Sequence, residues 1–371
     1  MNPLLITRRD WIKVAMSTAA GFALAPSTML PETPPARPGG GTIRLSLNES
    51  PFGPSPIAVQ AVRDQLSNLC RYTVQEADEI AGQIAAYEDV PVAHVLLGDV
   101  LEALGLHLGL QGPGGEFLYS VPGYTALVDA AKPAGGVGVP VPLDDRLEND
   151  LPTLQARINR QTRAVFVVNP HNPSGTVNDT AALRHFAGNV SQRTLVIVDE
   201  AYLEYLDDFR QRTLTDLVRA GCNVVVFRTF SKIYGLAGLP FGYVLAPVVL
   251  ADALRKHGVG DPHSLNRLAV AAASASLRDA CHVAGVRRQV AEERRKWLAL
   301  LDDLHLHHSE TVGSFIFFET GRPHDQIAAA FLKRGIDIGR AFPPFDKWTR
   351  ITIGLPEENA RVQQALRSIL T

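Results

Sequence analysis

The chain has 371 residues, which is enough for one large domain and a smaller one. Its composition, 46% hydrophobic and 20% charged, is that of an ordinary globular protein. The formal net charge of -2 gives no basic field that would indicate a nucleic-acid partner. Three scattered cysteines, Cys70, Cys222 and Cys281, predict neither a disulfide framework nor a zinc site, although one pair could still be oxidised.

Residues 1–30 have the pattern of an export signal. A basic segment that contains Arg8, Arg9 and Lys13 precedes an uncharged, mostly apolar stretch at 14–25. The paired arginines resemble the twin-arginine type of signal. An amphipathic first helix is the weaker alternative, because the apolar stretch has no charged face. We therefore expect a signal peptide, either cleaved or kept as an anchor, and an exported, periplasmic protein that meets the membrane only through this signal.

The segment that follows, residues 31–42, is rich in Pro and Gly and predicts a linker. Beyond it, three near-continuous apolar runs predict strands that are buried on both faces of a parallel sheet. These runs cover residues 163–168, 194–198 and 223–227, and helical patterns lie between them at 180–190 and 214–220. The alternation predicts an α/β fold with a mainly parallel sheet.

Polar residues follow each of the three runs. They are Asn169-Pro-His-Asn-Pro-Ser-Gly175, Asp199-Glu-Ala-Tyr202 and Arg228-Thr-Phe-Ser-Lys232. Because ligands of open α/β sheets bind beyond the carboxyl ends of the strands, these segments predict one site that holds Asn, Asp and Lys side chains. Three unrelated polar turns are the alternative, and the chemical types of the residues argue against it.

The pattern changes after Pro262. A long helical region at about 265–304 precedes short strands at 313–318 and 349–353. This change predicts a smaller α+β domain over 261–371, after an N-terminal arm and a large domain over 43–260. The histidines at 305, 307 and 308 match no ligand spacing, so no metal site is expected.

The predicted rim offers what pyridoxal 5′-phosphate (PLP) requires of a protein. Lys232 supplies an amine that can form a Schiff base with the cofactor aldehyde. Asp199 supplies a carboxylate for the pyridine nitrogen, which keeps the ring protonated as an electron sink. Asn172, Tyr202 and Ser231 supply hydrogen-bonding groups for the ring oxygen and the phosphate. The sequence therefore predicts a PLP site.

The chain also resembles a known family, the fold-type I, class I/II PLP-dependent aminotransferases, and within it histidinol-phosphate aminotransferase above all. The resemblance covers roughly residues 45–370. It rests on the three polar segments named above, with the Lys232 segment extending to Gly238, on Asn48-Glu-Ser-Pro-Phe-Gly-Pro54, and on Arg350-Ile-Thr-Ile-Gly354 with Glu357-Glu-Asn359. It implies a three-layer sandwich, a PLP cofactor, and transfer of an amino group between an amino acid or amine and a 2-oxo acid.

The resemblance assigns roles by position. Lys232, Asp199 and Tyr124 are the implied catalytic residues: Lys232 carries the cofactor and moves the proton, Asp199 pairs with the ring nitrogen, and Tyr124 stacks on the ring. Asn172 and Tyr202 bind the ring oxygen.

The remaining implied contacts concern the phosphate and the substrate. The phosphate is held by Ser231, by a helix start at Asp99, Val100 and Leu101, and by Tyr72 reaching over from a neighbouring subunit, which implies a homodimer. Arg350 clamps the substrate carboxylate, a geometry that lysine cannot copy, and Asn48 joins it.

Two departures from the family pattern concern this phosphate. Pro240 stands where the family has an arginine, and Val100-Leu101 stand where it has Gly-Ser. Each lost hydrogen bond to a charged group weakens binding by about 1.5–3 kcal/mol. We expect reduced phosphate affinity or a substitute cation, for which Arg228 is the nearest candidate in sequence. The same residues would also serve a PLP-dependent decarboxylase or lyase, and the departures leave open a non-catalytic binding protein with this fold.

Overall fold

The computed structural model describes residues 41–370. The predicted signal peptide and almost all of the predicted linker lie outside these residues. Within them, no helix is both long and apolar enough to cross a membrane. Residues 41–370 belong to one compact unit, and the expected boundary between a large and a small domain near residue 261 stays a prediction.

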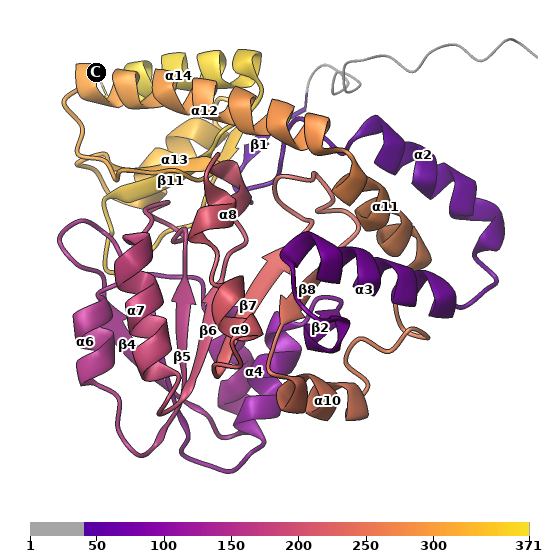
Figure 1. The fold of residues 1–371 in the computed structure, drawn as a ribbon. Helices are drawn as coiled ribbons and strands as arrows, with labels where there is room; N and C mark the ends of the chain where they lie inside the picture. Colours follow the sequence, from indigo (N-terminus) through magenta and orange to yellow (C-terminus); the bar gives the residue numbers. More distant parts are fainter. Residues whose placement is uncertain (1–40, 371) are drawn as a thin grey trace, which may run out of the picture. The chain divides into compact units, whose positions relative to one another are not determined.

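A seven-stranded sheet forms the centre of the fold (Figure 1). Its strand order is β2-β8-β7-β6-β5-β3-β4; β8 is antiparallel to β2 and β7, and the remaining neighbours are parallel. The strands are β2 (Val95–Leu97), β3 (Glu116–Val121), β4 (Val137–Pro142), β5 (Thr162–Val168), β6 (Leu195–Asp199), β7 (Val224–Thr229) and β8 (Gly242–Leu245). The predicted α/β fold with a mainly parallel sheet is confirmed.

The side chains of the central strands alternate between two apolar layers. In β5, Val165 and Val167 belong to one layer, whereas Phe166 and Val168 belong to the other. All four side chains are buried. A strand that is buried on both faces needs apolar residues at every position, and this need explains the unbroken hydrophobic runs in the sequence.

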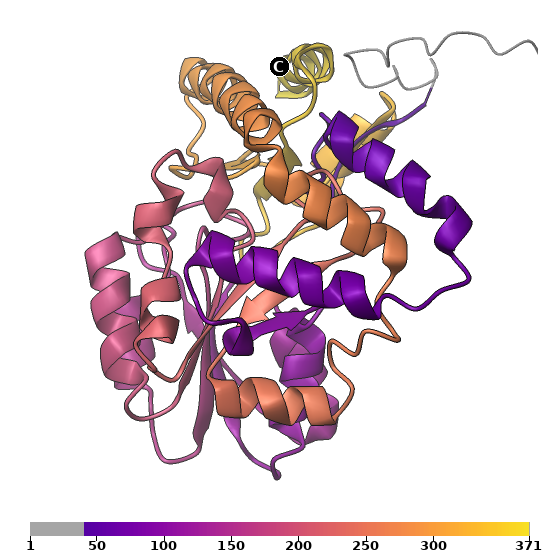
Figure 2. The same cartoon turned by 45° about the vertical axis from the view of Figure 1, so that its right-hand side comes forward.

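Helices supply both layers, and Figures 1 and 2 show their arrangement around the sheet. One layer contains α3 (Val74–Glu88), α6 (Leu151–Ala156), α7 (Thr180–Val190), α9 (Thr215–Arg219) and α11 (Arg267–Arg278). The other contains α4 (Leu101–Gly109), α5 (Ala126–Ala131) and α10 (Val248–Lys256). The structure is therefore the expected three-layer sandwich, with the sheet as its middle layer.

The C-terminal part carries two small sheets. Strand β9 (Phe315–Glu319) pairs antiparallel with β11 (Trp348–Thr352), and β1 (Ile43–Leu45) pairs parallel with β10 (Ile336–Ile338). The remaining elements are α2 (Pro56–Gln65), η1 (Leu66–Asn68), η2 (Val92–His94), η3 (Lys132–Ala134), η4 (Leu203–Tyr205), α8 (Phe209–Arg212), α12 (Ala280–Asp303), α13 (His324–Leu332) and α14 (Pro356–Leu370). The β1–β10 pair fixes the segment that leads into Asn48 against the C-terminal part.

The long helical region expected at 265–304 is two helices, α11 and α12. They are separated at Asp279, whose carboxylate accepts a hydrogen bond from the His282 N–H at 3.0 Å. An aspartate in this position caps the start of a new helix. The apolar periodicity continues across the break, so it does not reveal the break.

Candidate active site

A cavity of about 530 Å³ lies beyond the carboxyl ends of β5, β6 and β7. The β1–β10 and β9–β11 pairs contribute its other wall. Ten of the twelve site residues predicted from the sequence line it: Asn48, Asp99, Leu101, Tyr124, Asn172, Asp199, Tyr202, Ser231, Lys232 and Arg350. The three strand ends therefore converge as the sequence predicts.

Val100 and Tyr72 do not line this cavity. The Val100 side chain is fully buried in the apolar layer under α4, and the residue stands at the N-cap of that helix without a side-chain cap. Only backbone groups of this helix start can therefore face an anion here. The Tyr72 side chain is 70% exposed and packs on the His263 ring, with 5.0 Å between ring centroids.

Asp199 is the buried acid of the site. Its only side-chain hydrogen bond from the described residues comes from the Ala201 N–H, at 3.0 Å. Burial raises the pKa of Asp199 to about 7, with additions from the charges of Glu200 and Glu102, against the opposing effects of the Ala201 N–H and Lys232. A buried carboxylate with so little compensation fits a cationic partner, such as the protonated ring nitrogen of PLP.

Lys232 lies in the turn after β7. Its Nζ is 3.5 Å from the Leu47 carbonyl oxygen and 5.7 Å from the centre of the Tyr202 ring. Lys232 makes no ion pair with any described residue, so its amine can react within the cavity. The Leu47 contact depends on the β1–β10 pair, which holds the N-terminal arm over the lysine.

Arg350 and Asn48 connect the substrate side of the cavity to the predicted ring-oxygen ligands. The Arg350 guanidinium donates to Asn172 Oδ1 at 2.6 Å and to the Ser46 carbonyl oxygen at 2.7 Å. Asn48 donates through Nδ2 to the Tyr202 hydroxyl at 3.0 Å. These bonds orient the side chains of Asn172 and Tyr202, both of which line the cavity.

Arg350 is buried, and this burial lowers its pKa to about 10, so it stays charged at neutral pH. Its Nε has no hydrogen-bond partner among the described residues. This Nε is itself buried, so the guanidinium faces the cavity only as a charged group in its lining, and such a charge suits an incoming carboxylate.

Sequence reasoning missed several residues that line the cavity. They include Ser46, Leu47, Thr229, Ile338, Arg340 and Phe342. Arg340 and Arg350 both lie over the Phe342 ring, at 4.4 and 5.1 Å from its centre. No motif marks Arg340 or Phe342, because β10 and the loop after it have no distinctive pattern. Thr229 is the last residue of β7, and its position three residues before Lys232 could have identified it.

Arg228 does not reach the cavity, so the expectation that it replaces the missing phosphate-binding arginine is wrong. Its side chain is 1% exposed, and its Nε lies 3.0 Å from Glu200. Strand alternation is the reason, because Phe227 faces the cavity and Arg228 faces the other side of the sheet. Pro240 is exposed and does not line the cavity either. The two arginines that line the cavity, Arg340 and Arg350, both lie over the Phe342 ring.

Two minor expectations concern sites elsewhere. All three cysteines are free thiols, and Cys70 and Cys281 are exposed. Residues 41–370 contain no group of three or more His, Cys, Asp or Glu side chains that could hold a metal ion. In the 305–308 segment, His308 Nε2 lies within hydrogen-bond distance of Asp302 Oδ1, at 3.1 Å.

A mainly parallel α/β sheet that presents a lysine, a buried carboxylate and an amide at one rim defines a PLP-dependent enzyme. The family model described as aminotransferase class I and II matches residues 41–369, and the chain belongs to this family. PLP supplies an electron sink for bond cleavage at the substrate Cα. The protein is thus a PLP-dependent aminotransferase.

Individual relatives agree with the family assignment. The chain is 36% identical over 335 residues to a histidinol-phosphate aminotransferase of Moorella thermoacetica, a match that covers 88% of this chain and 85% of that protein. It is 38% identical over 341 residues to an aromatic amino acid aminotransferase of Thermobifida fusca, covering 89% and 93%. A crystal structure of histidinol-phosphate aminotransferase from Sinorhizobium meliloti in complex with pyridoxal-5′-phosphate superposes with a TM-score of 0.81 at 27% identity, covering 89% and 90%.

The missing guanidinium at the phosphate end of the cavity generates a gain-of-affinity prediction. Pro240 is exposed and adjoins Phe241, whose carbonyl oxygen accepts from the Phe230 N–H at 3.0 Å. The resemblance to the family puts a phosphate-binding arginine at position 240, and on that ground, although Pro240 itself does not line the cavity, we expect Pro240→Arg to lower the Kd for PLP roughly tenfold by adding a charge-assisted hydrogen bond. Titration of cofactor-free protein measures this. Pyridoxal, which lacks the phosphate, is the matched ligand, and its Kd should not change; an equal effect on both ligands would contradict the prediction.

The raised pKa of Asp199 predicts how the stability of the cofactor-free protein depends on pH. The folded state holds a proton on Asp199 up to about pH 7, whereas the unfolded chain releases it near pH 4. Stability is therefore lost as the pH rises between these values. Relative to Asp199→Asn, the wild type should lose about 2–3 kcal/mol of unfolding free energy between pH 5 and pH 8. Denaturant titrations of both proteins measure the difference, and parallel pH profiles would refute it.

Proposed function

We propose that the protein transfers an amino group to a 2-oxo acid from a donor that combines an anionic group with a flat ring. Lys232 carries the cofactor and moves the proton at the substrate Cα, Asp199 pairs with the ring nitrogen, and Arg350 binds the anionic group of the donor. The observation that carries this proposal is the convergence of these three side chains on one cavity.

The remaining lining residues orient the reactants. Asn172 and Tyr202 are held by Arg350 and Asn48 and can donate to the ring oxygen. Tyr124 lies at the cavity with 39% of its surface exposed, and burial of the rest raises its pKa, so the phenol stays neutral and available for stacking. The α4 N-terminus at Asp99 and Leu101, with the hydroxyls of Thr229 and Ser231, can bind the phosphate.

The donor follows from the wall around Phe342. Two guanidinium groups, Arg340 and Arg350, flank this ring, and Leu47 and Ile338 add apolar surface. Such a wall suits a flat ring next to an anion. The two named relatives act on histidinol phosphate and on aromatic amino acids, and both donors have these two features. We therefore regard them as the first candidates.

Arg350→Lys tests the role of the clamp. A lysine keeps the charge but loses the planar fork, so we expect the KM for the donor to rise roughly 10- to 100-fold with a smaller change in kcat. The readout is the absorbance change of the bound cofactor when histidinol phosphate or an aromatic amino acid is added. Arg334→Lys, at an exposed residue that follows α13 and does not line the cavity, is the control. If the donor KM of Arg350→Lys equals that of the control, the assignment of Arg350 is wrong. If the wild type shows no absorbance change with either donor, the proposed class of donor, an anionic group next to a flat ring, is wrong.

We also propose a homodimer that forms through the N-terminal helical surface. Large apolar side chains on residues 47–74 are 45–70% exposed: Leu47, Ile57, Leu66, Leu69, Tyr72 and Val74. Six exposed large apolar residues within one short part of the chain favour a protein interface there. Tyr72, which is 70% exposed, belongs to this set of residues, and the resemblance to the family implies that its hydroxyl contacts the phosphate of a second subunit.

Leu69→Glu tests this surface. The residue is 60% exposed, so the charge should not disturb the fold, but it should weaken the dimer at least tenfold by placing a carboxylate in an apolar contact. Sedimentation velocity over a range of concentrations measures the association. Leu332→Glu, at the same 60% exposure on α13, should leave it unchanged. A monomeric wild type, or equal weakening by both variants, would refute the proposed surface.

Finally, we propose that the protein is exported through the twin-arginine route, on the basis of Arg8 and Arg9 and the uncharged stretch at 14–25. The double variant Arg8→Lys, Arg9→Lys keeps the charge and removes the arginine pair. It should hold the full-length chain in the cytoplasm, whereas the wild type should fractionate with the periplasm or the membrane. Identical fractionation of the two chains would contradict the proposal.

A further inference from the structure

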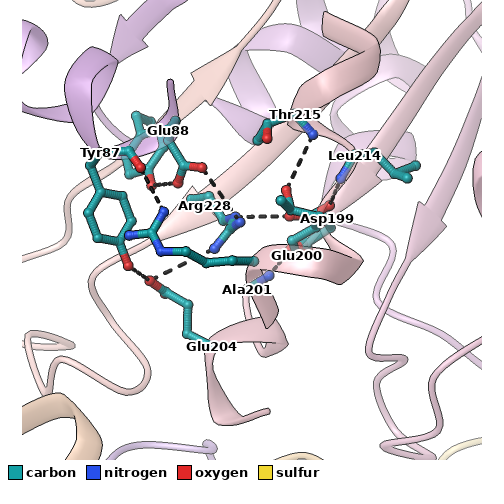
Figure 3. Close-up of polar contacts among 12 residues, drawn as sticks. Tyr87, Glu88, Asp199, Glu200, Ala201, Glu204, Leu214, Thr215 and Arg228 are labelled. Atoms are coloured by element: carbon teal, nitrogen blue, oxygen red, sulfur yellow. Dashed lines mark hydrogen bonds and ion pairs between the residues drawn. The ribbon is translucent and has the colours of Figure 1, made fainter. Parts of the chain in front are cut away.

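A second charged cluster lies directly behind the cofactor cavity, on the opposite side of β6 and β7. Figure 3 shows Arg228 of β7 surrounded by Glu88, Glu200 and Glu204. All four side chains are between 1 and 4% exposed. The Arg228 guanidinium lies 3.0 Å from Glu200 and 3.8 Å from each of Glu88 and Glu204. We call these four residues the Arg228 cluster.

The cluster contains three carboxyl groups for one guanidinium. Burial raises the pKa of Glu200 and of Glu204. Tyrosine hydroxyls compensate in part: Tyr243 donates to Glu88, and Tyr87 and Tyr234 donate to Glu204. Such a cluster is costly to bury, and removing one partner from it is strongly destabilising. Because burying the Arg228 cluster costs free energy, stabilisation of the fold does not by itself explain the cluster.

The cluster joins the segments that carry the cofactor-contacting residues. Glu200 directly follows Asp199, and its carboxylate also accepts from the Leu214 N–H and the Thr213 hydroxyl, at 2.9 and 2.8 Å. Glu204 comes two residues after Tyr202. Its partner Tyr234 comes two residues after Lys232. Asp199, Tyr202 and Lys232 therefore each have a nearby residue in the chain that is hydrogen-bonded or ion-paired within the cluster or to one of its members.

The backbone transmits this hold directly to Asp199. The Glu200 N–H donates to the Phe227 carbonyl oxygen at 3.0 Å, and the Asp199 carbonyl oxygen accepts from the Asn169 N–H at 2.8 Å. The Asp199–Glu200 peptide is thus bonded to the ends of both neighbouring strands. Because successive side chains point to opposite faces, the Glu200 side chain and the Asp199 carboxylate share this fixed peptide from opposite sides of the sheet.

We propose that the Arg228 cluster is a positioning group, in which the Arg228–Glu200 ion pair holds the Asp199 carboxylate and the Lys232 amine in register with a single coenzyme. The proposal rests on PLP binding at Lys232. It assigns to Glu200 a task that goes beyond fold stability, although Glu200 touches neither cofactor nor substrate.

Glu200→Gln tests the proposal on the full-length enzyme. Glutamine keeps the size of the side chain and an oxygen for the Leu214 N–H, but it removes the charge that holds Arg228. Glu293→Gln is the matched control, because Glu293 is also buried and hydrogen-bonded, to Asn359 and Lys296, in α12 and away from the cavity. The readouts are the melting temperature, the Kd for PLP, and the pH titration of the absorbance band of the lysine-bound cofactor.

A positioning role predicts that Glu200→Gln raises the Kd for PLP on the order of tenfold, as loss of an outer partner of a ligand residue does. It also predicts a shifted midpoint of the absorbance titration, whereas Glu293→Gln lowers the melting temperature without either change. If both variants lower the melting temperature alike and keep the wild-type Kd and titration, the cluster is purely structural and the proposal is overturned. If Glu200→Gln does not fold, Glu204→Gln, which loosens the link to Tyr234, must show the same two shifts. A wild type without the absorbance band would instead overturn PLP binding itself.

Discussion

Burial of the Asp199 carboxylate is the constraint on which the site depends. The end of β6 lies inside the sandwich, and the only hydrogen bond that the described residues give this carboxylate comes from the Ala201 N–H. An isolated buried carboxylate tends to keep its proton. A protonated ring nitrogen of PLP removes this tendency, because the acid then pairs with a cation. The Asp199 carboxylate would keep the ring nitrogen of PLP protonated, and the positive charge of that nitrogen would in turn stabilise the ionised carboxylate.

The remaining side chains are arranged around this acid by strand geometry. Parallel strands end at the same edge of the sheet, so the segments after β5, β6 and β7 bring Asn172, Asp199 and Lys232 together. The N-terminal arm closes the arrangement, since β1 pairs with β10 and places Leu47 against the lysine. The same alternation sends Glu200 and Arg228 to the opposite face, where they form the Arg228 cluster. Cofactor site and buried cluster are therefore two sides of the same pair of strands.

Much of this site could be predicted from the sequence, because unbroken apolar runs identify strands that are buried on both faces. The sequence patterns described above do not predict the other four strands of the sheet, which are β2, β3, β4 and β8. Strand β4 contains Gly138, Pro140 and Pro142 and lies at the sheet edge, where proline is tolerated but the β pattern is weak. Strands β2 and β8 have only three and four residues.

The direction in which a side chain points is the second feature that limits prediction of the site from the sequence. Arg228 is close to Lys232 in sequence, yet strand alternation points it away from the cavity, toward Glu200, Glu88 of α3 and Glu204 of η4. Arg340 and Phe342 lie near Arg350 because β10 packs beside β11, and no local sequence pattern predicts that contact. Contacts that depend on packing between distant segments are not visible in a single sequence.

The most direct test of the account is borohydride reduction of the native protein with PLP, followed by digestion and mass spectrometry. The account predicts one pyridoxyl adduct, on the peptide that contains Lys232. No adduct, or an adduct on another lysine while Lys232 stays unmodified, would contradict it.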